Sequence, residues 1–117
     1  MTKKIIVDGK EMTMRASALI PRLYRYHFKR DIIQDMQALE KAFKKAQEEG
    51  EPLKAVDLTI FENVAWLFLK QGGEEVGESP DEWLDSLEGM FSIYQVFPDM
   101  MELWQANLQT TAIPKKK

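Results

Sequence analysis

The chain has 117 residues, the size of one domain, and its 44% hydrophobic and 30% charged residues are typical of a globular protein rather than a disordered one. It has no cysteine, which excludes disulfides, thiolate nucleophiles and thiolate metal sites and is typical of a reducing compartment. The net charge of −3 excludes a general basic field that would attract nucleic acid, so only a local patch could bind it.

No segment has the length expected of a signal peptide or a membrane span. After the first lysines, only Ile5–Val7 are apolar before Asp8 and Gly9. The longest wholly apolar run is Val64–Leu69, whereas a membrane-spanning helix needs roughly 20 residues. We therefore expect a soluble cytoplasmic protein.

Residues Lys3–Arg15 have the pattern of a β-hairpin. Asp8-Gly9 supplies the two positive-φ positions of a type I′ turn between two β-prone runs. Pairing Val7 with Lys10 collects four apolar side chains on one face: Ile5, Val7, Met12 and Met14. Because a lone hairpin is marginally stable, we expect this face to pack on helices.

Two helices are expected next. The first spans Ser17–Phe28 and is entered near Pro21, because proline is well placed in a first turn. The second begins at Asp31 and ends at Gly50 and Pro52. Its apolar side chains recur at spacings of four and three, as on one face of an α-helix: Ile32, Met36, Leu39, Phe43 and Ala46.

Three more helices complete the expected fold. Leu58–Gln71, with Asp57 as its N-cap, is apolar on nearly all sides and must be central in the fold or covered by a partner. A capping box with proline at the first helical position, Ser79–Glu82, starts a short fourth helix. The last helix begins near Ser92, and Pro98 is expected to kink or divide it. Its apolar stripe is Ile93, Phe97, Met100, Trp104 and Leu108.

The predicted fold class is mainly helical, α+β, with an N-terminal β-hairpin packed on about five helices. A single domain covers residues 1–109. Residues 110–117 have no periodicity and end in three lysines, so we expect a disordered basic tail.

The residues offer little for chemistry. The single histidine, His27, has no cysteine or second histidine with which to hold a metal ion. No serine lies in a nucleophile elbow, and Ser17, Ser79 and Ser92 are better explained as helix caps. The glycine pair 72–73 lacks the lysine and the spacing of a phosphate-binding loop. We therefore predict a protein that is not an enzyme and that binds neither a metal nor a cofactor.

The segment Arg22–Arg30 interleaves cations with aromatic rings, a composition used by proteins that bind single-stranded nucleic acid. In the competing structural interpretation, the large side chains of a helix face the core: Leu19, Leu23 and Tyr26, with Tyr24 and Phe28 as further candidates. The arginines and lysines between them then face solvent or pair with acids. The net negative charge favours the structural interpretation, and a nucleic-acid-binding regulator is the alternative function.

Seven methionines, three tryptophans and six phenylalanines are an apolar excess for so short a chain. Methionine suits surfaces that repack against an irregular partner, so this excess indicates a protein-binding surface. A core tightly filled by methionine explains the same composition, and both interpretations remain open at this point.

A series of segments follows one another over nearly the whole chain: Ile5–Lys10, Pro21–Arg25, Phe28–Met36, Phe61–Trp66, Pro80–Leu84, Phe91–Pro98 and Glu102–Trp104. Together they resemble the tail assembly chaperones of long-tailed phages and prophages of Gram-positive bacteria. No single segment carries a known chemical role, so the resemblance depends on the whole series.

The resemblance implies a protein made in the cytoplasm of the infected host and absent from the mature virion. It would bind the long helical tape measure protein, keep it soluble and promote assembly of the tail tube around it. In such systems a programmed ribosomal frameshift often yields a longer form that recruits the tail tube protein, and the A-rich codons of Lys115–Lys117 are compatible with such slippage. The alternative becomes a phage-encoded nucleic-acid-binding regulator that uses residues 22–30. The sequence leaves open whether the chain forms a homo-oligomer.

We expect the tape measure protein to bind the third and last helices. Such a client is a chain of amphipathic helices whose apolar faces must be covered before assembly, and an apolar groove would cover them. The resemblance supplies no binding residues, so five large apolar side chains are predicted on physical grounds: Trp66, Phe97, Met100, Met101 and Trp104. This placement requires that they are not all buried within the chain itself.

Overall fold

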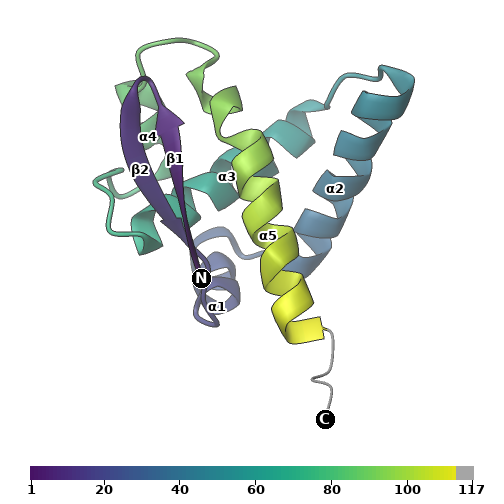
Figure 1. Cartoon of the computed structure of the whole chain (residues 1–117), viewed down its shortest axis with the longest axis horizontal. Helices are drawn as coiled ribbons and strands as arrows, with labels where there is room; N and C mark the ends of the chain where they lie inside the picture. The colour runs from purple at the N-terminus through teal and green to yellow at the C-terminus, as the bar shows by residue number, and fades with distance from the viewer. Residues whose placement is uncertain (113–117) are drawn as a thin grey trace.

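The computed structural model describes the backbone of residues 1–112 and the side chains of residues 1–108. Its elements in chain order are β1 (Thr2–Val7), β2 (Lys10–Arg15), α1 (Ile20–Phe28), α2 (Ile32–Glu49), α3 (Ala55–Gln71), α4 (Pro80–Ser86), the 3-10 helix η1 (Ser92–Gln95) and α5 (Phe97–Ala112). The predicted fold class is confirmed, because an antiparallel N-terminal hairpin packs against five α-helices in one mainly helical globule (Figure 1).

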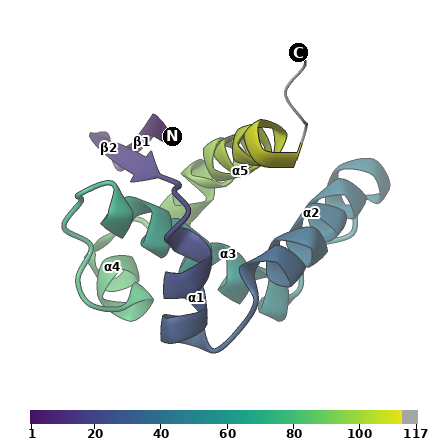
Figure 2. The same ribbon diagram turned by 90° about the horizontal axis from the view of Figure 1, so that it is seen from below.

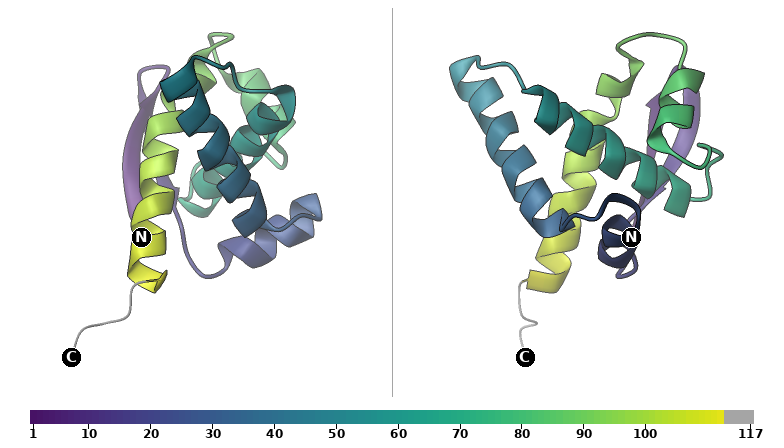
Figure 3. Two further views of the ribbon diagram at one scale, coloured as in Figure 1. Left: turned by 90° about the vertical axis from the view of Figure 1, so that its right-hand side faces the viewer. Right: turned by 180° about the vertical axis from the view of Figure 1, so that it is seen from behind.

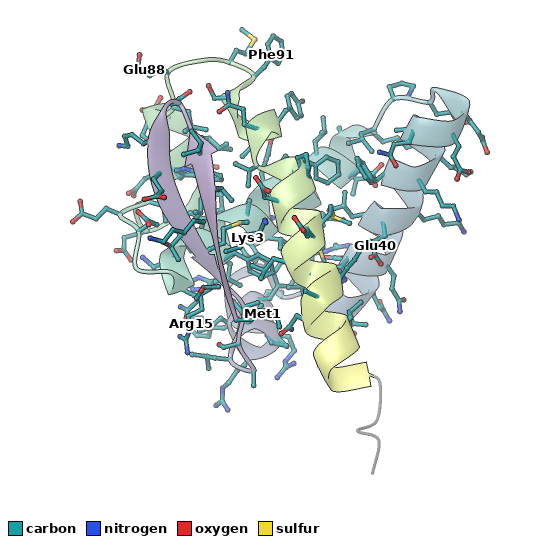
Figure 4. All side chains as sticks on the ribbon, in the orientation of Figure 1. Met1, Lys3, Arg15, Glu40, Glu88 and Phe91 are labelled. Atoms are coloured by element: carbon teal, nitrogen blue, oxygen red, sulfur yellow. The ribbon has the colours of Figure 1, made fainter. Side chains whose placement is uncertain are left out.

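The hairpin has the predicted register. Val7 pairs with Lys10, and Asp8 and Gly9 both take positive φ angles, 54° and 77°, as a type I′ turn requires. Its four apolar side chains are buried against the helices. On the same face of the sheet, Lys3 of β1 lies beside α5 and its Nζ contacts the carboxylate of Glu102 at 2.9 Å (Figure 4). This ion pair holds the hairpin to the C-terminal helix.

Helix α3 is the centre of the fold, which confirms one of the two alternatives predicted for this apolar segment. It contacts α1, α2, α4, α5 and the second strand, and it crosses the molecule between α2 and the hairpin (Figure 3). Seen from below, α1 lies between α4 and α2 (Figure 2). At the end of α3, a Cβ on Gly72 would lie 2.0 Å from the carbonyl oxygen of Thr13, so this close approach to β2 requires glycine.

Helix α3 begins earlier than predicted. Asp57 is its third residue and not its N-cap, because its carboxylate accepts a hydrogen bond from the backbone N–H of Lys54 at 3.1 Å. This is the acidic half of a capping box, which stabilises a helix start three residues upstream of the acid.

The C-terminal helix is divided as predicted, but its end differs from the prediction. It is divided into η1 and α5, with Pro98 in the first turn of α5, where a missing N–H costs no helical hydrogen bond. Helix α5 continues to Ala112, so residues 110–112 are helical where a disordered tail was predicted. A helix that has started gains one backbone hydrogen bond per added residue, even without an apolar stripe. The remainder of the predicted tail, 113–117, lies outside the described residues.

Candidate protein contact surface

The five side chains predicted to bind a client lie in the chain's own core. All are at most 7% exposed: Trp66, Phe97, Met100, Met101 and Trp104. The ring of Phe97 packs between Phe43 and Phe61, with centroid distances of 4.6 and 4.7 Å. The indole N–H of Trp66 donates to the carbonyl oxygen of Val76 at 3.3 Å. These large side chains are therefore buried within the fold and are not exposed to a partner.

Large apolar side chains are instead exposed on the connection between α4 and α5. Met90 is 85% exposed, Phe91 67% and Tyr94 41%, and we call these three residues the 90–94 patch. The ring of Tyr94 stacks with that of Phe91, with centroids 6.0 Å apart, and with the buried ring of Phe61, with centroids 6.5 Å apart. Phe91 lies at the far end of the connection and points away from the body of the molecule (Figure 4).

The sequence contained a signal for this patch that the prediction did not use. Residues 91 and 94 are three apart and are offset from the stripe that begins with Ile93 and Phe97, whereas Met90, three residues before Ile93, falls on that stripe. Because Ile93 and Phe97 are buried, the offset side chains point away from the core.

A groove of about 440 Å³ lies beside the patch, between α3, α4 and the connection. Its lining combines apolar and acidic side chains: Leu84, Leu87, Met90 and Ile93 with Glu62, Asp85 and Glu88. Among the ion pairs between described residues, none involves these three acids. Partial burial, and then the nearby negative charge of Asp81, raises the pKa of the Glu62 carboxyl.

The tip of the hairpin holds the connection in place. Asp8 accepts a hydrogen bond from the backbone N–H of Glu88 at 2.7 Å and another from the hydroxyl of Ser92. Its own backbone N–H donates to the side-chain oxygen of Gln95 at 3.1 Å. The hydrogen bonds from Ser92 and then Glu88 lower the pKa of Asp8, because they favour its ionised form. Asp8, which was predicted only as a turn residue, thus positions a segment 80 to 87 residues away along the chain.

A buried polar network joins α1 to the start of α2. The Tyr24 hydroxyl donates to Asp35 Oδ2 at 2.7 Å, and Arg30 donates to both oxygens of the same carboxylate at 2.7 and 2.8 Å. Burial opposes ionisation of Asp35, but the hydrogen bonds from Arg30 and Tyr24 outweigh it and hold the pKa of this carboxyl below its ordinary value. Tyr24 and Arg30 of the basic and aromatic segment therefore have a structural role.

The rest of the segment at residues 22–30 is more exposed than the structural interpretation predicted. Tyr24 is buried as expected, but Tyr26 is 71% exposed and Leu19 47% exposed, so their predicted core positions are wrong. Helix α1 is only nine residues long and buries the narrow stripe of Ile20 and Tyr24, from which residue 26 is turned well away. The amine of Lys29 lies 5.5 Å from the centroid of the Tyr26 ring.

The remaining candidate groups for chemistry have local partners. Ser79 caps α4 by accepting from the N–H of Glu82, and the Ser17 hydroxyl accepts from the N–H of Leu19. His27 is exposed, and its ring meets Trp66 edge-on. Within residues 1–108 no group of three His, Cys, Asp or Glu side chains is arranged to hold a metal ion. None of the described helices combines the length and the apolar character needed to cross a membrane.

No family model, curated protein or solved structure matches this chain. Its likeness to tail assembly chaperones therefore remains a resemblance of segments. Two surface features suit contact with a partner: the 90–94 patch with its groove, and the exposed cations around Tyr26.

Proposed function

We propose that this chain is a tail assembly chaperone that binds the tape measure protein of a long-tailed phage or prophage, keeps it soluble and promotes tail tube assembly around it. The observation that supports this best is the 90–94 patch, in which Met90, Phe91 and Tyr94 stay outside a well-filled core. Clustered exposed apolar side chains are typical of protein interaction sites. An unassembled client made of amphipathic helices needs such a surface to cover its apolar faces.

The segments that carry the resemblance also supply this surface and its support. Phe91–Pro98 contributes Phe91 and Tyr94 of the patch, and Ile5–Lys10 contributes Asp8, which holds the connection. The resemblance thus includes exposed residues as well as core residues.

In this proposal the protein acts in the cytoplasm of the infected host, uses no cofactor and catalyses no reaction. Contact with the tail tube protein is made by a longer form that arises by frameshifting near Lys115–Lys117. The nucleotide sequence tests this part directly. An uninterrupted A-run followed by an overlapping frame is expected, whereas lysine codons interrupted by G with no such frame would exclude it.

Co-expression with the tape measure protein of the same genome tests the main proposal. We expect the tape measure protein to remain soluble and to copurify with this chain. The double variant Phe91→Ala/Tyr94→Ala should lose the complex, while Tyr26→Ala, which removes an exposed aromatic ring elsewhere, should keep it. Circular dichroism of each variant shows that it is folded. Precipitation of the tape measure protein with the wild-type chain, as without it, would contradict the proposal.

A second candidate function is supported by the exposure of Tyr26 beside Arg22, Arg25 and Lys29. An exposed ring among cations suits base stacking and phosphate contact in a nucleic-acid-binding regulator. This function predicts a gel shift with single-stranded nucleic acid that weakens steeply with added salt and is lost in Arg22→Gln/Arg25→Gln. No shift at low salt would exclude it.

A further inference from the structure

We propose that the groove beside the 90–94 patch binds a basic amphipathic helix of the partner, with the apolar stripe of that helix on Leu87 and Met90 and its lysines or arginines beside Asp85 and Glu88. This inference rests on the proposed function, because the helix would be a segment of the tape measure protein. It adds the charge of that segment and the site at which it docks.

The shape and lining of the groove suit a helix with one apolar face. Its volume of about 440 Å³ is enough for side chains from one face of a helix and not for the helix itself, which is about 10–12 Å across. Ile93 is buried and forms apolar floor, Leu84 and Leu87 are half-buried, and Met90 is almost fully exposed at the rim. A flexible methionine at the rim can adjust to the side chains that enter.

The charge of the lining selects a basic helix over an acidic one. Some acids elsewhere among the described residues have cationic partners, as in the pairs of Asp35 with Arg30 and of Glu102 with Lys3. Glu62, Asp85 and Glu88 take part in none of the ion pairs found among the described residues. The raised pKa of Glu62 also favours a basic partner. Partial burial, and then the negative charge of Asp81, raises this pKa, and no cation in the described part of the chain compensates for them.

The groove is also organised before any partner arrives. Asp8 fixes the backbone of Glu88 and the hydroxyl of Ser92, so the segment that carries the patch is tied to the hairpin. A preformed surface loses less conformational entropy on binding than a loose one.

The chain's own lysine-rich end does not fit as the occupant within the same molecule. Helix α5 leads away from the connection, and its end lies on the opposite side of the molecule (Figure 1). Its 16 residues span roughly 24 Å, whereas residues 113–117 reach at most about 18 Å when fully extended. Only the end of a second copy could enter, which would make the chain associate with itself.

Two labelled 18-residue peptides test the partner chemistry with the full chain. One carries a leucine stripe flanked by lysines, and the other has glutamate at every lysine position. We expect the lysine peptide to bind and the glutamate peptide not to bind, as measured by fluorescence anisotropy. Equal binding of the two peptides, or binding of neither, would overturn the proposal.

Matched variants locate the site. Asp85→Asn/Glu88→Gln should weaken binding of the lysine peptide about tenfold, as expected for two charge pairs at the rim of an interface. Glu48→Gln/Glu49→Gln changes the net charge equally at the end of α2 and should have no effect. Equal loss in both double variants would show a general charge effect and overturn the proposal. Self-association that disappears when residues 113–117 are removed would identify a second copy as the occupant and overturn it too.

The same variants separate this inference from the proposed function. If the tape measure protein copurifies equally with wild type and with Asp85→Asn/Glu88→Gln, the docking site is wrong and the chaperone function stands. If the lysine peptide binds in the groove but the tape measure protein precipitates, the chaperone function is wrong and the site for a basic helix stands.

Discussion

Replacing Tyr24 by phenylalanine removes one hydroxyl and retains the packing of the ring. Tyr24 is fully buried and its ring lies 5.0 Å from that of Phe28, so phenylalanine can occupy the same space. The lost interaction is the 2.7 Å hydrogen bond to Asp35, and a hydrogen bond to a charged group contributes about 1.5–3 kcal/mol. Arg30 keeps both of its bonds to the carboxylate, so we expect the lower part of that range, about 1.5–2 kcal/mol.

Urea and thermal unfolding measure this loss. A destabilisation of about 1.5–2 kcal/mol corresponds to a fall in Tm of roughly 5–8 °C for a chain of this length. Tyr26→Phe is the matched control, because it removes a hydroxyl from an exposed tyrosine of the same helix and should leave the Tm unchanged.

The pH dependence gives a second measurement of the same interaction. The folded pKa of Asp35 lies below its ordinary value, so the ionised carboxylate stabilises the fold above the unfolded pKa, about 3.9. That stabilisation is lost as the pH falls through the lower folded pKa. The difference between wild type and Tyr24→Phe should therefore shrink below about pH 4. A difference under about 0.5 kcal/mol at pH 7, or one that is unchanged in acid, would refute the reasoning.

Three further predictions concern the close contact behind the hairpin, the groove and the connection. Gly72→Ala should destabilise the fold by about 2 kcal/mol or more in urea unfolding, because the new Cβ would collide with the carbonyl oxygen of Thr13. A neutral effect would show that β2 does not approach the end of α3 this closely. Glu62→Gln should raise the Tm slightly at pH 7 and not below about pH 4. The reason is that the pKa of Glu62 is higher in the folded state than in the unfolded state, so its ionised form weakens the fold. A lower Tm at pH 7 would contradict this. Asp8→Ala should speed hydrogen exchange at the Glu88 amide and lower the Tm, and unchanged exchange in NMR would show that Asp8 does not hold the connection.

The parts of this protein that sequence alone determined depend on neighbours along the chain. The register of the hairpin follows from the turn residues Asp8 and Gly9, and the start of α4 follows from Ser79 and the proline after it. The apolar surplus of Leu58–Gln71 likewise limited this helix to a central position or to one covered by a partner, because a helix that is apolar on all sides cannot be left in water. The structure shows the central position.

Tertiary structure decided which of the apolar side chains are covered. Trp104 and Tyr26 are both large residues on short helical stripes, yet the first is packed in the core and the second faces solvent. Helical periodicity shows which residues share a face of a helix. Which of these faces is buried depends on packing against other segments that are distant in the sequence. For the same reason, the sequence-based prediction placed the client surface on residues that are buried, and it missed the exposed Phe91. The segment that carries Phe91 is held outside the core by a hydrogen bond from the backbone N–H of Glu88 to Asp8, 80 residues away along the chain.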